Sequence, residues 1–448
     1  MTINAEDKND KVEVTLKDVN IDTSSRNKAA VSVTGEGDTN IKLNGDNALK
    51  SDIYRSGIYG SGSGSLTISG GENDSLTAQG GSGANGISSS GSLTISGGTV
   101  TANGDDGGRG ISSSGSVTIS GGSTVTANGG SGTISGGDGI CSSGGVTISG
   151  GSTVTANGGN GGSLVGGDGI RSGGGLTVSD GTVTAKGGNG DSKDGYGGDG
   201  IRSGGVVTIS GNTVNAAGGY GGKVGGYGIC SFDRVAISGG TVEAAGGNGS
   251  TGGGDGIYSS DIDLSGSLEL TAKAGSPTGK ALLQNGRELD LDTIKDKLGP
   301  GAKVTATDAN GETKQVSIPR PVEPEGPVIP EESSSSSGGG SAAPSAPVSP
   351  LPGLTVTDKD GQRISYTSTQ SGNTLTVCVG RLTASFRISL AALRQLRAEG
   401  IETITFQTIL CSTTLSLDEL LAMGGEDAEV VLTHHIRSST LTVGGKAV

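Results

Sequence analysis

The stretch GGDGIRSGGGLTVSDGTVTAKGGNG, residues 166–190, decides the fold of this chain because close copies lie on both sides of it. The dipeptide Gly-Ile recurs every 24 to 31 residues, and two short runs such as LTVS and TVTA follow it each time. Internal repetition of this kind is typical of a solenoid, in which each repeat forms one coil that packs on its neighbours. The recurring isoleucines are Ile58, Ile87, Ile111, Ile140, Ile170, Ile201, Ile229 and Ile257.

Apolar and polar residues alternate within each run, which predicts strands with one buried face. Three short strands per repeat, joined by Gly, Ser, Asn and Asp turns, describe one coil of a right-handed parallel β-helix. We expect the glycines at corners, where positive φ is often required. A single coil cannot stand alone. Burying its five apolar side chains contributes on the order of 10 kcal/mol, whereas ordering its roughly 29 residues costs about 1–2 kcal/mol for each of them. In residues 166–190 the expected inward set is Ile170, Leu176, Val178, Val183 and Ala185, and the outward set is Thr177, Thr182 and Thr184.

Composition divides the chain into three parts. Residues 1–318 form the predicted β-helix, in which the first 50 residues are opening coils and residues 279–318, with a possible short helix at LDLDTIKDKLG, are the C-terminal cap. Residues 319–353 are rich in Pro, Ser and Gly, which predicts a linker without a packed core. Residues 354–448 predict a small α/β module. The chain is thus mainly β.

The last module contains an internal duplication. Residues 386–408 and 414–435 each predict a strand, a helix and a strand, and Ser416 with Glu419 has capping-box spacing. His434 and His435 lie on a predicted strand without a visible nucleophile, so we interpret them as structural or solvent-facing. The leucines on the two helices are Leu390, Leu393 and Leu396, and Leu417, Leu420 and Leu421.

Charge and cysteine content limit the function classes. The 448 residues carry a formal charge of −14, which disfavours nucleic acid as a partner because phosphate binding needs clustered Lys and Arg. The N-terminus is no signal peptide, and no apolar run is long enough for a membrane-spanning helix. We expect an exported protein whose signal peptide has been removed, without membrane insertion. The four cysteines form no CxxC motif; Cys141 and Cys230 would lie too far apart to pair, and a bond between Cys378 and Cys411 stays open.

A charged element precedes and follows the Gly-Ile dipeptide. Asp138, Asp168 and Asp199 occupy the same position on successive coils, about 4.8 Å apart. Such a row of carboxylates repels itself unless Ca²⁺ or cationic side chains lie between its members. Arg171 and Arg202 follow the isoleucines and are close enough to neutralise the row. The element either binds calcium or sugar, or it caps the turns and forms surface ion pairs.

Two further surfaces have candidate functions. Sugar rings usually stack on aromatic side chains, which are scarce here but gather in the later coils. Pairs of threonines in a Thr-x-Thr pattern predict two outward ranks on one sheet. Such an array could bind ice, although β-branched polar residues also suit any exposed sheet, and the pattern breaks at Asn215 and Glu243. The aromatic residues are Tyr196, Tyr220, Tyr227, Phe232 and Tyr258, and the threonine pairs are Thr99/Thr101, Thr124/Thr126, Thr153/Thr155 and Thr182/Thr184.

The repeats GDGIRSGGGLTVSDGTVTA, GDGICSSGGVTISGGSTVTA and GDGIRSGGVVTISGNTVNA resemble the β-helical carbohydrate-binding domain family of exported Gram-positive bacterial proteins, over about residues 10–275. The resemblance implies a pectate-lyase-like fold that binds acidic polysaccharide without cleaving it, calcium along the helix, and a wall-associated location. Here Gly137, Gly167 and Gly198 stand where the family usually has a further acidic residue. Arg171 and Arg202 stand where histidine is common, and Gly173 and Gly204 stand where the family has a later aspartate, so fewer carboxylates are left for calcium.

We therefore expect a non-catalytic, extracellular or surface-bound protein that binds polysaccharide along a face or corner of the β-helix. A structural stalk or adhesin that binds a protein or host glycan is the alternative, and a polysaccharide lyase is the third possibility. The candidate calcium ligands are Asp138, Asp168 and Asp199. The candidate carbohydrate-binding residues are Asp168, Arg171, Asp199, Arg202, Tyr227 and Tyr258.

Overall fold

The computed structural model describes residues 1–319 and most of residues 354–447. Residues 320–353, and the short stretches 359–362, 365, 372, 380–382, 409–411, 424–427, 435–438, 445 and 448, lie outside the described part. The chain divides into two compact units, Met1–Gly326 and Pro327–Val448. No helix among the described residues is long and apolar enough to span a membrane.

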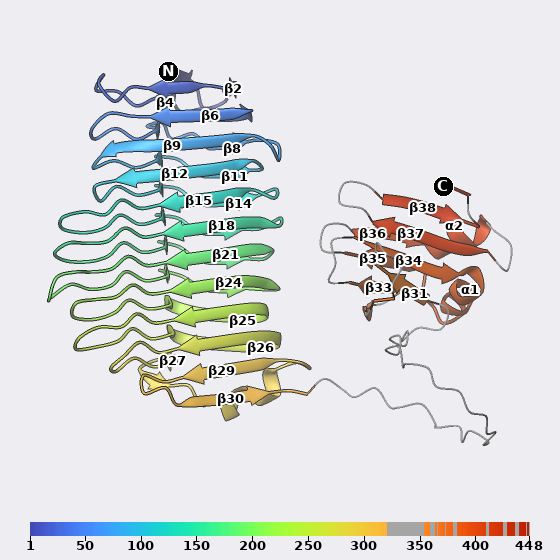
Figure 1. The fold of residues 1–448 in the computed structure, drawn as a ribbon. Coiled ribbons are helices and arrows are strands. Elements are labelled where there is room, and N and C mark those ends of the chain that lie inside the picture. Colours follow the sequence, from blue (N-terminus) through green and yellow to red (C-terminus); the bar gives the residue numbers. More distant parts are fainter. Residues whose placement is uncertain are drawn as a thin grey trace, which may run out of the picture. The chain divides into compact units, whose positions relative to one another are not determined.

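The first unit is a parallel β-solenoid whose strands stack in three ladders (Figure 1). The long strands β25 (Ile229–Ala245) and β26 (Ile257–Lys273) each pass through all three. Ladder A contains β1 (Thr2–Ala5), β4 (Val31–Gly35), β7 (Ile58–Gly60), β10 (Ile87–Ser89), β13 (Ile111–Ser113), β16 (Ile140–Ser142), β19 (Ile170–Ser172), β22 (Ile201–Ser203) and β27 (Leu282–Gln284). Ladder B contains β2 (Lys11–Lys17), β5 (Asp38–Asn44), β8 (Leu66–Ser69), β11 (Leu93–Ser96), β14 (Val117–Ser120), β17 (Val146–Ile148), β20 (Leu176–Val178) and β23 (Val207–Ile209). Ladder C contains β3 (Asn20–Asp22), β6 (Asp46–Lys50), β9 (Ser75–Ser82), β12 (Thr99–Asp105), β15 (Thr124–Asn128), β18 (Ser152–Asn157), β21 (Gly181–Lys186), β24 (Asn212–Ala217) and β29 (Lys303–Thr307).

The predicted three-strand coil and its buried side chains are confirmed. The isoleucines after each glycine form one continuous column in ladder A, with Ile140 paired to Ile170 and Ile170 to Ile201. The inward set predicted for residues 166–190 is fully buried, from Ile170 to Ala185. These columns of Ile, Leu, Val and Ala make one core that runs through all coils of the solenoid.

Glycine is required in the coils for two different structural reasons. Between ladders B and C, Gly150 and Gly151 turn the corner with φ values of 63° and 70°, as expected from the sequence. Between ladders C and A, from β15 onward, the chain makes long loops that stack on one side of the solenoid (Figure 1). Each loop has an outgoing and a returning arm, which we call its limbs, and the glycines in the limbs do not have positive φ. They contact one another directly, since the N–H of Gly167 donates to Gly159 O and the N–H of Gly188 donates to Gly167 O, both at 2.8 Å.

These limb glycines form one hydrogen-bonded zigzag along the solenoid. A Cβ atom on Gly188 would lie 1.9 Å from Gly159 O, and a Cβ on Gly167 would lie 1.9 Å from Gly137 O. Only glycine fits at such positions, because no side chain can occupy the space taken by a backbone carbonyl. The zigzag consists of Gly130, Gly137, Gly159, Gly167, Gly188, Gly198, Gly219, Gly226, Gly247, Gly254 and Gly275.

The predicted C-terminal cap is confirmed. The short helix is a 3-10 helix, η1 (Leu291–Lys297), which covers the end of the core with Leu291 and Ile294. Strand β29 continues ladder C in parallel, whereas β30 (Thr313–Ser317) pairs with it antiparallel and so stops the coil repeat. The short strand β28 (Arg287–Glu288) pairs with β27 at the same end.

The second unit contains two strand–helix–strand segments. Strand β34 (Ala384–Ser389) leads through helix α1 (Leu390–Ala398) to β35 (Thr403–Gln407), and β36 (Ser412–Ser416) leads through α2 (Leu417–Ala422) to β37 (Glu429–His434). Each copy connects the two sheets of the module, and Phe386 and Phe406 meet in the shared core with ring centroids 5.3 Å apart. The remaining strands are β31 (Leu354–Thr357), β32 (Thr367–Ser371), β33 (Thr374–Cys378), β38 (Ser439–Val443) and β39 (Lys446–Ala447).

Candidate functional site

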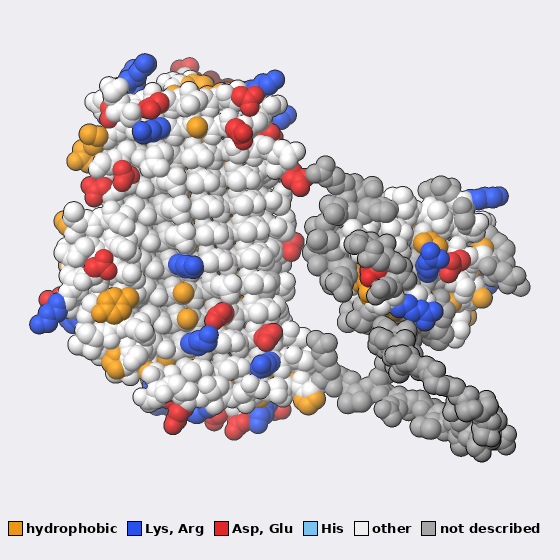
Figure 2. Space-filling model, viewed as in Figure 1, with side chains coloured by type: hydrophobic (Ala, Val, Ile, Leu, Met, Phe, Trp, Pro, Cys, Tyr) orange, Lys and Arg blue, Asp and Glu red, His pale blue; other side chains and the backbone are white. Residues whose placement is uncertain are grey.

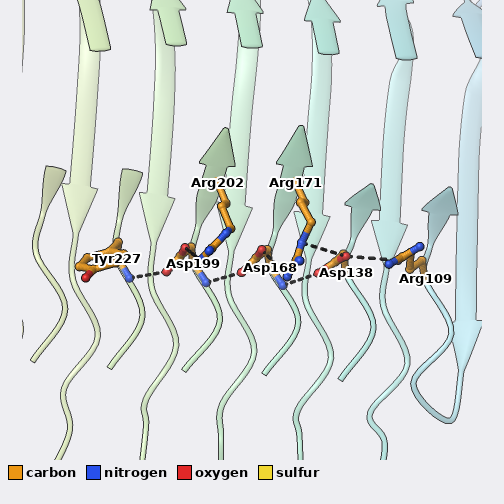
Figure 3. Close-up of polar contacts among 7 residues, drawn as sticks. All are labelled: Arg109, Asp138, Asp168, Arg171, Asp199, Arg202 and Tyr227. Carbon is orange, nitrogen blue, oxygen red and sulfur yellow. Dashed lines mark hydrogen bonds and ion pairs between the residues drawn. The ribbon is translucent and has the colours of Figure 1, made fainter. Parts of the chain in front are cut away.

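The carboxyl row lies where each stacked loop enters a ladder A strand. Asp138, Asp168 and Asp199 are 3 to 4% exposed, and their side chains follow one another along the solenoid (Figure 3). Each Oδ1 accepts a hydrogen bond from the next coil: Asp168 N–H donates to Asp138 at 2.9 Å, and Asp199 N–H donates to Asp168 at 2.8 Å. Tyr227 N–H donates to Asp199 at 2.8 Å. The row therefore satisfies backbone donors that the turn would otherwise leave buried and unpaired.

Arginines neutralise the other carboxylate oxygens of the row. Arg171 places Nη2 2.8 Å from Asp168 Oδ2 and Nε 3.4 Å from Asp138 Oδ2. Arg202 Nη1 lies 3.1 Å from Asp199 Oδ2. Arg109 Nε also lies 3.2 Å from Asp138 Oδ2, a contact that the sequence analysis missed although Arg109 occupies the row position one coil earlier. The arginine side chains remain 38 to 43% exposed, so part of each guanidinium faces solvent.

Burial shifts the titration of the row. Burial, together with the charge of Asp199, raises the pKa of Asp168 to about 7, against the lowering effect of Arg171. Burial also raises the pKa of Asp199, against the lowering effect of the Tyr227 N–H bond and of Arg202. Asp255 takes the row position one coil after Tyr227, and burial raises its pKa to about 6.

The row does not fit a calcium ion. Calcium takes six to eight oxygen ligands from carboxylates, carbonyls and water. Here one oxygen of each carboxylate accepts a backbone N–H bond, and the other lies beside a guanidinium. In the described part of the chain no three His, Cys, Asp or Glu side chains are grouped so that they could hold a metal.

Aromatic side chains adjoin the row on the exposed side of ladder A. Tyr227 and Tyr258 stack with ring centroids 5.1 Å apart and an interplanar angle of 19°. The guanidinium carbon of Arg202 lies 5.1 Å from the ring centre of Phe232, which is 54% exposed. Cys230 lies between Arg202 and Tyr258 in the strand register. We call the outward residues of this region, Arg171, Arg202, Tyr227, Phe232 and Tyr258, the Arg/Tyr strip.

The structure thus brings all six predicted carbohydrate-binding residues into one region, but with different exposures. The Asp168 and Asp199 carboxylates lie beneath the arginines, whereas Tyr227 and Tyr258 are half-buried at the surface. Phe232 belongs to the aromatic group expected in the later coils, but its contact with Arg202 was not predicted. Tyr196 and Tyr220 belong to the stacked loops instead, where Lys223 Nζ lies 5.6 Å from the ring centre of Tyr196.

Of the remaining candidate residues, His434, Cys141 and Cys230 are buried. His434 is fully buried in the second unit, where its Nε2 lies 2.9 Å from Thr413 Oγ1, and burial lowers its pKa. Cys141 and Cys230 are buried free thiols three coils apart, as predicted, and Cys378 is also free. His435 and Cys411 lie outside the described residues.

Comparison of the chain with protein-family models, curated proteins and solved structures found no match. The family resemblance of the repeats therefore rests on their residues alone. The parallel β-helical fold that it implied is present in the structure.

Proposed function

We propose that the solenoid is a non-catalytic polysaccharide-binding module whose ligand lies along the Arg/Tyr strip. The observation that carries this proposal is the placement of Arg202 over Phe232 beside the stacked pair Tyr227 and Tyr258. Aromatic faces offer stacking surfaces for sugar rings, and guanidinium groups donate several hydrogen bonds to hydroxyl oxygens. Because the strip crosses several coils, a chain of sugars running along the solenoid axis would contact it more fully than a single sugar.

The charge balance of the strip favours a ligand rich in hydroxyls over a strongly charged one. Arg109, Arg171 and Arg202 lie against the three carboxyls of the row, so little positive charge is left for an anion above about pH 7, where Asp168 is ionised. Binding would depend on stacking and hydrogen bonds, and it would change little with salt. It would also require no calcium, because the carboxylates that were candidate ligands already have partners.

A non-catalytic role suits the same arrangement. A glycosidase needs two carboxyl groups across a groove, one as acid and one as base or nucleophile. The carboxyls of the row lie beneath the arginines of this strip at 3 to 4% exposure and accept hydrogen bonds from the backbone. We propose a protein of the cell surface or the extracellular space that holds a wall or environmental polysaccharide.

A structural stalk or adhesin is the second candidate function. The regular stacking of coils favours it, because ladders that continue in one register make a stiff, elongated body. In this role the strip would contact a protein or a host glycan, and the Pro/Ser/Gly-rich segment would act as a spacer. The two functions differ in what the Arg/Tyr strip binds.

A polysaccharide array with and without calcium tests the proposal on the full chain. We expect binding that persists in a chelator and that Phe232→Ala with Tyr258→Ala weakens by about tenfold, or about 1.4 kcal/mol. Tyr54→Ala is the matched control, because Tyr54 is 78% exposed but lies far along the solenoid, in the loop before β7. Absence of binding to every polysaccharide would contradict the proposal and favour the stalk, and unsaturated products from pectate would instead identify a lyase.

A further inference from the structure

A second surface, the outward face of ladder C, has a regular array of hydroxyl groups. Strands β12, β15, β18 and β21 each present two threonines, and the pairs are in exact register from one coil to the next. We call this array the threonine plate. It consists of Thr99 and Thr101, Thr124 and Thr126, Thr153 and Thr155, and Thr182 and Thr184.

The threonine plate repeats in two directions. Neighbouring rungs of a sheet lie about 4.8 Å apart, and alternate residues of one strand lie about 6.6 Å apart. Sheets of many strands usually twist, but the strands of ladder C stack almost parallel to one another (Figure 1). The hydroxyls therefore form a nearly planar lattice in place of a curved row.

The side chains of the plate are held in position and available to water. Threonine is β-branched, so its χ1 angle is restricted on a strand. A rank of amides borders the plate, where Asn128 Nδ2 donates to Asn103 Oδ1 at 2.8 Å and Asn157 Nδ2 donates to Asn128 Oδ1 at 2.9 Å. In the described part of the chain none of the eight plate hydroxyls hydrogen-bonds to another protein group, whereas the serines of ladder A, such as Ser142 and Ser203, bond backbone carbonyls.

The plate is also free of charge in a chain that has 31 basic and 45 acidic residues. The members of the two threonine ranks and of the asparagine rank are uncharged on β12, β15 and β18. Asp105 at the end of β12 lies beyond these ranks, and Lys186 on β21, paired with Asn157, is the first charged residue within them. The uncharged area is visible in the middle of the solenoid in Figure 2, with charged side chains above and below it. The plate has no aromatic side chain, which separates it chemically from the Arg/Tyr strip.

We propose that the threonine plate binds the surface of ice. A planar lattice of water molecules is uncharged, and it matches a planar array of hydroxyls and methyls better than any single solute does. Fixed hydroxyls can order water at the repeat of the plate, and the methyl groups between them hold no competing hydration. Charged groups would retain their own water shells, so their exclusion from the plate has a physical reason. The inference is independent of polysaccharide binding, because it uses a different ladder and different residues.

Growth of an ice crystal in a solution of the labelled full chain tests the proposal. We expect the wild-type chain to enter the ice and to shape the crystals, and Thr126→Glu with Thr153→Glu to be excluded like an inert reference protein. Thr118→Glu with Thr147→Glu is the matched control on ladder B, where the threonines form a single rank, and it should behave as wild type. Thr126→Val with Thr153→Val removes the hydroxyls without adding charge, and it should also lose ice binding. This variant keeps the test valid even if the glutamate variant folds poorly.

Three results would overturn the ice proposal. Exclusion of the wild-type chain from ice would do so directly, whatever the variants show. Equal loss in the plate and control variants would assign the effect to added charge in general, and retention of ice binding by the valine variant would exclude the hydroxyls. Polysaccharide binding should be the same in the wild-type chain and both plate variants, so the two proposals fail separately.

Discussion

The coils from β15 onward contain two classes of glycine that the sequence does not distinguish. Gly150 and Gly151 turn the corner between ladders B and C with positive φ, and a Cβ on Gly151 would meet no atom within 4 Å. Gly159, Gly167 and Gly188 lie in the loop limbs, where neighbouring backbones approach so closely that a Cβ would overlap a carbonyl. The first class is selected for its backbone conformation, and the second for having no side chain. A glycine-rich composition, which is also typical of disordered chains, here produces a close-packed backbone layer.

Replacing a limb glycine should have the largest effect. In Gly188→Ala the new methyl group would lie 1.9 Å from Gly159 O, so the stacked loops must separate and their hydrogen-bonded zigzag must break. Overpacking usually costs about 1–3 kcal/mol, and we expect at least the upper end, about 3 kcal/mol, because the obstacle is backbone. Urea unfolding of the full chain, followed by circular dichroism, measures the change. A loss below that of a corner variant would disprove the distinction between the two classes.

Replacing a corner glycine should cost less. Gly151→Ala keeps open space around the new methyl group, so the only penalty is the left-handed backbone conformation at a φ of 70°. That conformation costs an L-residue about 1–2 kcal/mol. Gly151→Asn sharpens the result, since asparagine tolerates positive φ better than alanine and should recover part of the loss. If both variants are as damaging as Gly188→Ala, the corner is also limited by packing.

The same distinction explains how much of the fold the sequence predicts. Periodic apolar residues suffice for the coils, because burial on one face requires the alternation that Leu176 and Val178 display. The duplicated strand–helix–strand units were likewise visible from their leucine spacing. The glycine zigzag was not predictable, because contacts between limbs such as Gly159 and Gly188 depend on how loops of successive coils stack. No local pattern separates such a glycine from one at a turn.

The candidate site was predicted in part for a similar reason. A fixed offset from the isoleucine is enough to align Asp138, Asp168 and Asp199 in a row, and the structure has that row. The offset does not say that each Oδ1 accepts the N–H of the next coil, nor that Arg109 reaches across a coil to Asp138. Those contacts depend on side-chain direction, which the repeat does not encode. They show turn capping and ion pairing, and they leave the exposed parts of Arg171 and Arg202 as the portion of the element that we propose binds sugar.

The smallest expected effect is the pH response of the carboxyl that follows a limb glycine, Asp168. Its pKa of about 7 lies above the value of about 3.9 in an unfolded chain, so the native state holds the proton more tightly. The resulting stabilisation is complete below about pH 4 and is lost as the pH rises to about 7. We expect the wild-type chain to unfold more easily at pH 8 than at pH 5, by at least about 1 kcal/mol. Burial raises the pKa of Asp255 to about 6, so this carboxyl contributes with the same sign.

Asp168→Asn isolates this effect, because the amide oxygen can still accept the Asp199 N–H while the titration is removed. Melting temperatures at pH 5 and pH 8 should then differ less than in the wild type. Asp180→Asn, at an exposed position between ladders B and C of the same coil, should leave the difference unchanged. Carboxylates such as Asp38 and Asp74, whose hydrogen bonds lower their pKa, act below this pH window and do not interfere. An undiminished difference in Asp168→Asn would mean that the proton is held elsewhere in the row. Asp168 would then act only as a backbone cap, and the titration would belong to Asp199 or Asp255, whose pKa values burial also raises.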